Sequence, residues 1–438
     1  MTLEQKIANK EVKIGIIGLG YVGLPLAIEF TNTNFSVTGI DVLQEKVDLI
    51  NRGKNYIGDV VDGELAHAVQ AGFLKATTDF AVIRELDAIS ICVPTPLRKT
   101  KDPDVSYIIA ALEEIAKYLH KDMLIVLEST TYPGTTRELM LPKLEESGLK
   151  VGQDFYLAFS PERVDPGNPV YKTKNTPKVI GGVTKKCTEI AKLLYEEVVD
   201  TVVPVYSSES AEMVKLLENT FRAINIGLVN EVALMCDKLG VDVWEVIDAA
   251  ATKPFGFMKF YPGPGLGGHC IPIDPFYLSW KMKTLNYNAR FIELAGEINT
   301  AMPEYVVELL TEGLNQQKKA INGSRLLILG MAYKRDIDDV RESPALDVMK
   351  LLEAKGAAVD YHDPYVAEIQ WNGGHKKSVS SKDWDLTFYD AAIVITDHKN
   401  LDYEIVTRKV PLLIDTRNVT GKFISSYKNI IRLGDKRG

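Results

Sequence analysis

The sequence predicts an α/β protein with two Rossmann-like, doubly wound domains joined by a central helical region. Short apolar runs alternate with helical segments over the first 200 residues, and the same alternation returns after Arg325. Between these parts, residues 207–250 carry apolar side chains at helical spacing without a proline. Strands that alternate with helices build mostly parallel sheets, so each outer part is expected to hold one. A chain of 438 residues is too long for one core, and we expect domains at 1–206, 207–319 and 320–438.

The first strand–turn–helix–strand unit lies within residues 12–41. An isoleucine-rich strand, KIGIIG, precedes a helix that carries Leu24, Leu26, Ala27 and Phe30, and a second strand, SVTGID, follows. Further strands are expected at DAISICVP, MLIVLEST, FYLAFSP and PKVIGG, with helices such as SYIIAALEEIAKYL between several of them. This order predicts a mostly parallel sheet.

Beyond the central helix the chain passes through a loop rich in proline and glycine, KPFGFMKFYPGPGLGGHCIPIDP. Further helices are expected up to about residue 319. The second alternating unit then consists of strand LLILGMAY, helix SPALDVMKLLEAKG, and strands AVDYHDP, AAIVITD and PLLIDTR. The two alternating halves resemble each other in architecture only.

The bulk composition is that of an ordinary globular chain, with 46% apolar residues, 25% charged residues and a formal net charge of −8. This acidic balance argues against nucleic acid as the main partner. The polar N-terminus lacks a signal peptide's apolar segment, and no apolar run approaches the roughly 20 residues of a membrane span. The four cysteines are scattered without zinc spacing. We therefore expect a cytoplasmic protein without membrane contact or bound metal.

A glycine-rich turn follows the first strand and indicates a dinucleotide site. Gly18, Gly20 and Gly23 form the pattern G-x-G-x-x-G at the start of a helix. These glycines permit a tight turn, a close approach of the pyrophosphate and close packing of helix on strand. Asp41 ends the second strand, where a carboxylate accepts hydrogen bonds from ribose hydroxyls and repels a 2′-phosphate. The pattern therefore predicts NAD rather than NADP, with a merely structural turn as the alternative.

The second informative stretch surrounds Cys270. Glycines crowd the chain before this cysteine, and Asp274 follows four residues later. Such a loop brings backbone close to a ligand and leaves the thiol uncovered. The alternative is a buried free cysteine, which is what most cysteines are. Three others, in a predicted strand or helices, are interpreted as packing residues: Cys92, Cys187 and Cys236.

Seven motifs together resemble those of the UDP-glucose/GDP-mannose dehydrogenase family. They are GLGYVGLP, CVPTP, ESTTYPG, SPER, EMVKLLENTFRAINIGLVNE, GPGLGGHCIPIDP and GMAYKRDIDDVRESPA. They follow the family's order over essentially the whole chain. The resemblance implies an NAD-dependent enzyme that oxidises the C6 hydroxyl of a UDP-linked sugar to the carboxylate, with Cys270 as covalent nucleophile. Two hydride transfers are needed, and a thiohemiacetal followed by a thioester would hold the intermediate aldehyde.

The resemblance also assigns roles to residues around this chemistry. Lys215 and Asn219, at helical spacing i and i+4, are expected to stabilise an oxyanion at C6. Asp274 and Thr131 match positions that orient or activate water, and Glu162 matches an acidic residue of thioester hydrolysis or substrate positioning. The base of the first oxidation stays open between Lys215 and water held by Asp274. The implied NAD contacts are Gly18, Gly20, Tyr21, Val22, Gly23, Asp41, Pro94, Thr95 and Thr130.

Two departures from UDP-glucose enzymes favour an N-acetylhexosamine substrate. His269 stands where those enzymes usually carry serine, and Arg163 follows the SPE glutamate in place of an aromatic residue. UDP-N-acetylglucosamine is the preferred substrate, with UDP-N-acetylmannosamine, UDP-N-acetylgalactosamine or UDP-glucose as alternatives. His269 could tune the thiol or be structural, and Arg341 could bind substrate or pair with a neighbouring acid. The implied substrate contacts are Arg163, Lys259, Phe260, Gly267, His269, Lys334, Arg341 and Arg417.

The expected partners are the UDP-sugar substrate and further copies of the same chain. The helical middle is expected to build a homodimer or larger homo-oligomer, as in relatives.

A competing function is that of a two-electron dehydrogenase of 3-hydroxyacid type, which would share the first domain and the helical middle. It would lack the Gly-Gly-x-Cys loop and everything beyond residue 320. A non-catalytic nucleotide-sugar-binding protein is the alternative from another class, and the presence of both Cys270 and Lys215 argues against it.

Overall fold

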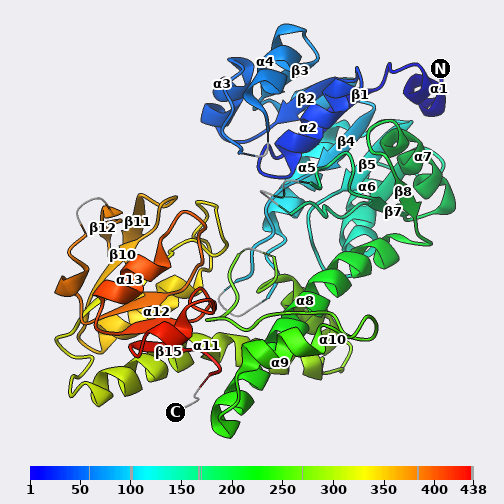
Figure 1. Ribbon diagram of the computed structural model, residues 1–438. Helices are drawn as coiled ribbons and strands as arrows, with labels where there is room; N and C mark the ends of the chain where they lie inside the picture. Colours follow the sequence, from blue (N-terminus) through cyan, green and yellow to red (C-terminus); the bar gives the residue numbers. More distant parts are fainter. Residues whose placement is uncertain are drawn as a thin grey trace. The chain divides into compact units, whose positions relative to one another are not determined.

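The computed structural model describes residues 1–435 except 59, 99–101, 166–167, 169, 269 and 382–383. The chain forms two compact units (Figure 1). Unit 1 comprises Met1–Glu218 and Trp280–Tyr287, and unit 2 comprises Asn219–Ser279 and Asn288–Gly438. Helix α8 (Ser208–Leu239) and helix α10 (Asp274–Thr284) each contribute residues to both units. The division into three domains at 206/207 and 319/320 stays a prediction.

Unit 1 is built on an eight-stranded sheet with the order β3-β2-β1-β4-β5-β6-β7-β8. The first six strands in this order run parallel, whereas β7 pairs with β6 in the antiparallel direction. The strands are β1 (Lys13–Ile17), β2 (Ser36–Ile40), β3 (Leu74–Thr77), β4 (Ala88–Ile91), β5 (Met123–Leu127), β6 (Phe155–Phe159), β7 (Lys178–Gly182) and β8 (Val202–Pro204).

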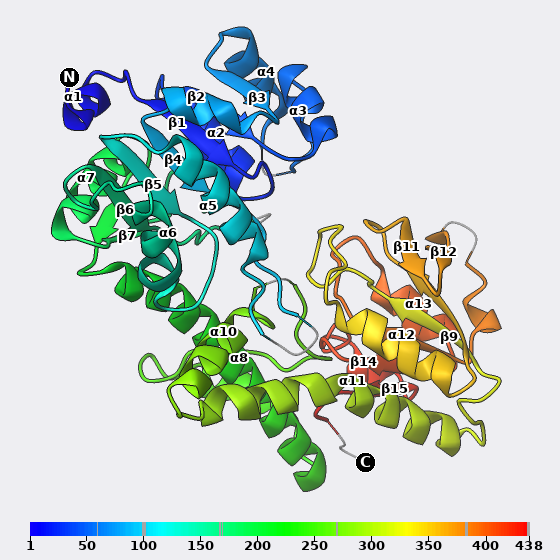
Figure 2. The ribbon, with the colours of Figure 1, turned by 180° about the vertical axis from the view of Figure 1, so that it is seen from behind.

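Helices cover both faces of this sheet, because side chains of successive strand residues point to opposite faces. Ile14 and Ile16 pack with α1, α2 and α7, while Ile17 packs with α5 and α6 on the other face. Figures 1 and 2 show α2 and α5 from opposite sides. The helical segments are α1 (Leu3–Ala8), α2 (Gly23–Asn32), α3 (Gln44–Asn51), α4 (Asp62–Gln70), η1 (Phe80–Glu85), α5 (Ser106–Tyr118), η2 (Thr135–Met140), α6 (Leu141–Glu145) and α7 (Lys185–Glu196).

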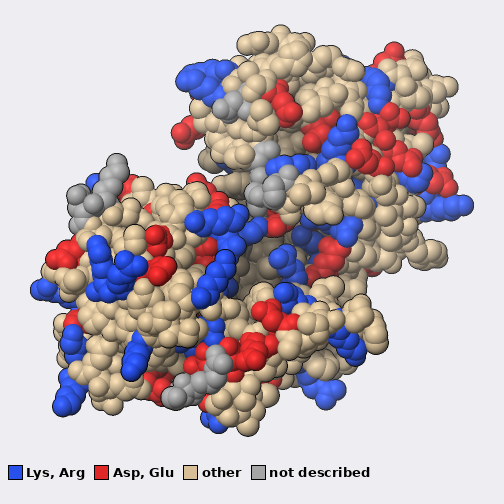
Figure 3. All heavy atoms as spheres, viewed as in Figure 1, with Lys and Arg blue, Asp and Glu red and all other residues tan. Residues whose placement is uncertain are grey.

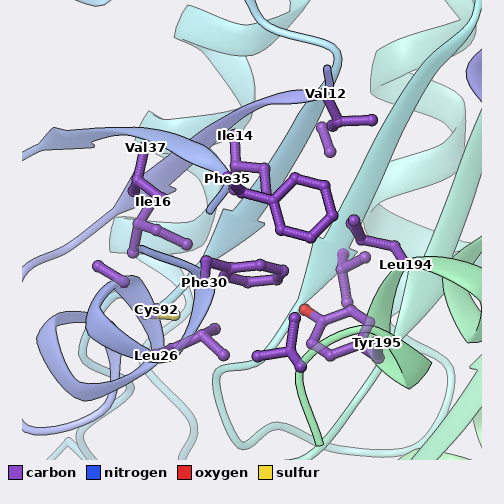
Figure 4. Close-up of a cluster of buried hydrophobic side chains, with 14 of the residues drawn as sticks. Val12, Ile14, Ile16, Leu26, Phe30, Phe35, Val37, Cys92, Leu194 and Tyr195 are labelled. Carbon is purple, nitrogen blue, oxygen red and sulfur yellow. The ribbon is translucent and has the colours of Figure 1, made fainter. Parts of the chain in front are cut away.

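One face of this core is rich in aromatic side chains. The Phe30 ring lies edge-on to Phe35 and to Tyr195, with centroid distances of 6.1 Å and 5.8 Å (Figure 4). Edge-to-face pairs of this kind stabilise a core beyond the area that they bury. Tyr195 therefore has a fixed place, with its ring in the apolar core and its hydroxyl available to polar groups at the sheet.

Unit 2 combines a second sheet with the long helices. Its five-stranded sheet is parallel throughout, with the order β10-β9-β13-β14-β15. The strands, with a separate β11–β12 hairpin, are β9 (Arg325–Leu329), β10 (Ala358–His362), β11 (Glu368–Trp371), β12 (Gly374–Lys377), β13 (Ala391–Val394), β14 (Leu413–Asp415) and β15 (Ile430–Arg432). The remaining helical segments are α9 (Val243–Ala250), α11 (Arg290–Gln316), α12 (Pro344–Ala354), η4 (Leu386–Phe388), α13 (Tyr403–Lys409) and η5 (Ile424–Ser426).

Helices α8 and α11 approach closely within unit 2. A Cβ added to Gly227 would lie 3.1 Å from the Cβ of Ala295, and Asn230 donates a hydrogen bond of 2.9 Å to Asn299. Both asparagines are buried, so the amide pair satisfies polar groups between the two helices. Side chains of α11 and α12 also pack on one face of the second sheet, and α13 packs on the other.

The predicted fold class is confirmed, and the differences concern short elements. Strands β3, β8 and β15 and the β11–β12 hairpin have at most four residues each and were not predicted. Short edge strands carry too few residues for a clear periodic pattern. Acidic and basic side chains are interspersed over the face in Figure 3. Among the described residues, none of the helices has the length and apolar character needed to cross a membrane.

Candidate active site

The glycine turn of unit 1 has the geometry that a dinucleotide needs. Gly18 has a φ of +91°, and a Cβ there would lie 2.6 Å from the carbonyl oxygen of Cys92. A Cβ on Gly23 would lie 1.9 Å from the carbonyl oxygen of Gly18. By contrast, a Cβ on Gly20 would meet no atom within 4 Å. The first and third glycines are therefore required by the fold, while Gly20 keeps open the space through which a pyrophosphate would approach.

Asp41 is held at the carboxyl end of β2. Its carboxylate accepts hydrogen bonds from the backbone amides of Leu19, at 2.9 Å, and Leu43, at 3.0 Å. Lys46 lies 3.4 Å away, and the side chain of Asp41 is almost fully buried. These contacts fix the carboxylate beside the glycine turn, so the residues present fit an NAD adenosine ribose. Of the other predicted NAD contacts, Tyr21 and Pro94 are exposed, and Val22, Thr95 and Thr130 are partly buried.

The loop after β5 is anchored by a buried carboxylate on α8. Glu212 accepts hydrogen bonds from the amide of Gly134, at 2.6 Å, and from the amide and hydroxyl of Thr136, at 2.9 Å and 2.7 Å. Burial raises the pKa of Glu212 to about 7, although these donors favour its charged form. The Thr131 hydroxyl lies 2.7 Å from that of Thr135. Glu212 therefore ties the Thr131 loop to the helix that carries Lys215.

Lys215 and Glu162 are the other predicted catalytic residues of unit 1. Lys215 is partly buried on α8, one turn after Glu212. Glu162 follows β6, and one of its carboxylate oxygens accepts hydrogen bonds of 2.7 Å from the amides of Arg163 and Val164. The guanidinium of Arg163 pairs with Glu218 at 2.6 Å and donates to the carbonyl oxygen of Pro177. Arg163 therefore has protein partners in this structure.

Cys270 precedes α10 in unit 2. Its carbonyl oxygen accepts hydrogen bonds from the amides of Ile273, at 3.0 Å, and Asp274, at 2.7 Å, which form the turn that starts the helix. Cys270 is partly exposed, whereas the other three cysteines are buried. Burial raises the pKa of Cys236 and places that of Cys92 well above its ordinary value. These thiols suit packing, and Cys270 suits reaction with a ligand.

Asp274 lies at the first turn of α10 and is buried. The side-chain amide of Asn219 donates a hydrogen bond of 2.5 Å to its carboxylate. Two residues from the predicted catalytic set are therefore in direct contact within unit 2. The Asn219 amide fixes one carboxylate oxygen of Asp274, which is a suitable arrangement for a residue that orients water.

The glycines before Cys270 pack against the segment that follows β9. A Cβ on Gly267 would lie 2.6 Å from the Cβ of Tyr333 and 3.0 Å from the carbonyl oxygen of Glu342. Gly268 has a φ of +86°, and its amide donates a hydrogen bond of 3.0 Å to the carbonyl oxygen of Arg341. The cysteine loop and the segment 333–344 therefore form one packed structure. His269 lies outside the described residues.

Cationic residues gather at the carboxyl ends of the second sheet. Arg417 is partly buried, and its Nε donates a hydrogen bond of 2.9 Å to the carbonyl oxygen of Ile395. A Cβ on Gly263 would lie 2.7 Å from this guanidinium. Burial, followed by repulsion from Arg335, lowers the pKa of Arg417 to about 10. Arg335 pairs with Asp397, and two guanidinium groups at such a site still favour an anionic ligand such as a diphosphate.

The remaining predicted substrate contacts have varied surroundings. Lys334 is partly buried. Arg341 is exposed and forms a bidentate ion pair with Asp339. A pair with a neighbouring acid was the alternative to substrate binding that the sequence left open for Arg341. Lys259 pairs with Asp248 at 3.4 Å, and the ring of Phe260 lies 5.8 Å from that of Phe221. Lys259 and Arg341 thus have intramolecular carboxylate partners.

Sequence reasoning missed Glu212, Tyr333, Arg335 and Lys178. Arg335 follows Lys334 directly, so the pair of adjacent cations was a usable signal. Glu212 lies three residues before Lys215, on the same helix face, which was a weaker signal. Nothing local in the sequence shows that Tyr333 packs on Gly267 and Gly268.

Comparisons with known proteins cover all three parts of the chain. The NAD binding domain of the UDP-glucose/GDP-mannose dehydrogenase family matches residues 12–199, its central domain matches 209–301 and its UDP binding domain matches 327–422. A UDP-N-acetyl-D-mannosamine dehydrogenase of Pyrococcus horikoshii is 35% identical, over 93% of this chain and 96% of that protein. A UDP-N-acetyl-D-glucosamine 6-dehydrogenase of Pseudomonas aeruginosa is also 35% identical, over 82% and 84%.

A solved structure supports the same assignment. The UDP-D-ManNAc dehydrogenase structure from Pyrococcus horikoshii matches with a TM-score of 0.89 at 34% identity, and the match covers 97% of this chain and all of that one. With its NAD-binding, central and UDP-binding domains in that order, the chain belongs to the UDP-glucose/GDP-mannose dehydrogenase family and is an NAD-dependent UDP-sugar 6-dehydrogenase.

Proposed function

We propose that this enzyme oxidises the C6 hydroxyl of a UDP-N-acetylhexosamine to the carboxylate through a thiohemiacetal and then a thioester on Cys270. The observation that carries the proposal is the cysteine loop itself. Its partly exposed thiol precedes α10, beside the Asn219–Asp274 pair, and its glycines pack on the segment that bears Lys334 and Arg335. A nucleophile and a cationic nucleotide site thus belong to the same unit.

The reaction removes four electrons and consumes one water. The sugar alcohol, two NAD and water become the carboxylate, two NADH and three protons. NAD, when bound, supplies the hydride acceptor for each oxidation. On the protein side, Asp41 would hold the adenosine ribose, and the amides after Gly20 would hold the pyrophosphate.

The polar residues are assigned to charge stabilisation and to water. Lys215 and Asn219 would stabilise the oxyanion that develops at C6, a contribution worth roughly 3–4 kcal/mol per donor in other enzymes. Asp274, with Thr131, would orient or deprotonate water, and Glu162 would assist hydrolysis of the thioester. Water attacks the thioester carbonyl, the carbon–sulfur bond breaks, and Cys270 is released as the thiolate.

The substrate is proposed to bind through its diphosphate and its acetamido sugar. Arg417 and Lys334 would supply positive charge for the diphosphate, and Arg335 would add to it when it exchanges Asp397 for the ligand. Arg341 is a further candidate, provided that it exchanges Asp339 for the ligand. Contacts to the sugar are assigned to Arg163, Lys259, Phe260, Gly267 and His269.

UDP-N-acetylglucosamine is the substrate that we place first, on the basis of the GGHC loop and Arg163. UDP-N-acetylmannosamine is the second candidate, because relatives with that name reach 38% identity over 85% of this chain. The two sugars differ only in configuration at C2, so a few contacts to the acetamido group would decide between them.

The test is the number of NADH molecules formed per sugar. Each of four limiting substrates is converted to completion: UDP-N-acetylglucosamine, UDP-N-acetylmannosamine, UDP-N-acetylgalactosamine and UDP-glucose. We expect two NADH per UDP-N-acetylglucosamine. We also expect kcat/KM for UDP-glucose to lie at least about tenfold below kcat/KM for UDP-N-acetylglucosamine, because leaving the acetamido site unfilled costs roughly 1.4 kcal/mol or more of transition-state binding. One NADH per sugar would contradict the double oxidation, and turnover of UDP-glucose alone would contradict the acetamido specificity.

We also propose that a second copy of the chain covers an exposed apolar face of α8 and α11 in unit 2. The face consists of Phe221, Leu228, Met235, Leu239, Phe291 and Leu294. Apolar patches on two adjacent helices are typical of self-complementary dimer interfaces. Light scattering should give twice the chain mass of 48.7 kDa, and Leu228→Lys should shift it toward one chain. A wild-type mass of one chain at micromolar concentration would contradict the proposal.

A further inference from the structure

A buried cluster of charged residues lies at the carboxyl edge of the sheet in unit 1. The Lys178 ammonium lies 2.7 Å from the Glu128 carboxylate and 3.8 Å from the Glu162 carboxylate. The side chain of Glu128 is fully buried, that of Lys178 is 5% exposed and that of Glu162 is 16% exposed. Burial alone would lower the pKa of Lys178, but the two carboxylates outweigh burial and raise it. One cation is thus shared between two carboxylates, which we call the inner carboxylate (Glu128) and the outer carboxylate (Glu162).

The reversed direction of β7 explains how the lysine reaches this place. Ala158 and Phe159 of β6 pair with Gly182 and Gly181 of β7. When this antiparallel register is continued by three residues, Glu162 falls opposite Lys178. A parallel strand would begin at the other edge of the sheet, so its first residue could not lie beside Glu162.

The inner carboxylate holds the ammonium in position. Glu128 directly follows β5, and it accepts a short hydrogen bond from the Tyr195 hydroxyl in addition to its contact with Lys178. The Tyr195 hydroxyl lies 3.0 Å from the Ser90 hydroxyl, and the Tyr195 ring is fixed in the aromatic core (Figure 4). The Glu128 carboxylate therefore has partners on both oxygens, which satisfies a buried charge.

The outer carboxylate is held from two sides. One oxygen of Glu162 accepts the amides of Arg163 and Val164, and the other faces the Lys178 ammonium. Two carboxylates share one ammonium, and Glu162 is the one that is farther from the ammonium and partly exposed. A small pocket lined by Glu162, Arg163, Thr173, Thr176 and Pro177 opens beside the lysine.

We propose that the Lys178–Glu128 pair is a positioning device that orients the Glu162 carboxylate for hydrolysis of the thioester. Lys178 steers Glu162 without neutralising it, because Glu128 keeps the ammonium 3.8 Å away from the outer carboxylate. This inference rests on the proposed role of Glu162, and neither Lys178 nor Glu128 needs to touch the substrate. In metal enzymes, loss of a partner that orients a ligand lowers activity about 10- to 100-fold, and we expect an effect of that size here.

The test separates oxidation from hydrolysis in the full-length enzyme with saturating NAD and UDP-N-acetylhexosamine. In Lys178→Met we expect a rapid burst of two NADH per active site, followed by a steady state about 10- to 100-fold slower than in wild type. Intact mass after acid quenching should show the acyl adduct on the protein. Glu162→Gln should behave in the same way. Lys178→Arg, which keeps the charge, should recover most of the steady-state rate.

Glu128→Gln provides a second variant should Lys178→Met fail to fold. Without the inner negative charge the ammonium is free to move onto Glu162 and neutralise it, so the same burst is expected. The matched control is Arg432→Met, which removes one partner of a buried ion pair with Asp242 in unit 2. It should lower the melting temperature without a burst.

Three outcomes would overturn the inference. If Lys178→Met and Glu128→Gln turn over at the wild-type rate and show no burst, the pair does not act on Glu162. If the burst and the steady-state rate of NADH formation are slowed equally in these variants, as in a merely destabilised protein, the pair serves folding alone. A wild type that forms fewer than two NADH per sugar would overturn the proposed double oxidation and this inference together, whereas the first two outcomes leave the proposed function intact.

Discussion

Replacing Cys270 by serine should lower the steady-state formation of the carboxylate product by about 10³-fold or more. The hydroxyl is similar in size to the thiol but is a far weaker nucleophile at neutral pH, so neither the thiohemiacetal nor the thioester forms efficiently. Liquid chromatography of the nucleotide products, together with NADH formed per sugar consumed, measures the effect. The variant should stall before the carboxylate, with fewer than two NADH per sugar.

Cys236→Ser is the matched control for this experiment. Cys236 is a buried thiol of the same unit, and we assign it to packing. Its replacement should leave the stoichiometry at two NADH per sugar, whatever it does to the melting temperature. Full conversion to the carboxylate by Cys270→Ser would remove the covalent mechanism, because no other described cysteine is exposed.

Gly20→Ala is the second substitution with a large expected effect. A Cβ at this position meets no protein atom within 4 Å, so the melting temperature should stay close to that of wild type. The added methyl group would project into the space reserved for the pyrophosphate, and we expect the Kd for NAD to rise at least about tenfold, equivalent to roughly 1.4 kcal/mol. Titration calorimetry with NAD and thermal unfolding without NAD measure the two effects separately.

Gly63→Ala is the control for Gly20→Ala. Gly63 lies in α4, and a Cβ there also meets no atom within 4 Å. Its replacement should leave NAD binding unchanged and raise stability slightly, because alanine is a better helix former than glycine by up to about 1 kcal/mol. Equal NAD affinities in Gly20→Ala and wild type would contradict the place that we assign to the pyrophosphate.

Much of the architecture and the family could be predicted from the sequence, because the signals were local and repeated. The turn at Gly18–Gly23 opens α2, and Asp41 directly follows β2, as the strand–turn–helix–strand pattern predicted. The dinucleotide cofactor and the family were confirmed by the comparisons. Seven motifs in one order carry far more information than any one glycine turn.

Contacts between distant segments could not be predicted in the same way. PKVIGG was expected as a strand, but its direction depends on pairing with β6 rather than on its own residues. The Lys178–Glu128 pair therefore joins residues 50 apart that no local pattern connects. The packing of Tyr333 on Gly267 and Gly268 is of the same kind. The epimer of the substrate is not decided by the comparisons either, since relatives of both names have similar identities.

The close packing between the cysteine loop and the segment 333–344 limits how this enzyme could be recombined with its relatives. Neither Gly267 nor Gly268 leaves room for a side chain against Tyr333, and Glu342 presents its carbonyl oxygen to Gly267. A chimera that exchanged the C-terminal part as a cassette would have to bring a matching tyrosine and main-chain path with it. The loop that carries the nucleophile and the part that is matched by the UDP binding domain should therefore have changed together during divergence, as one inherited block.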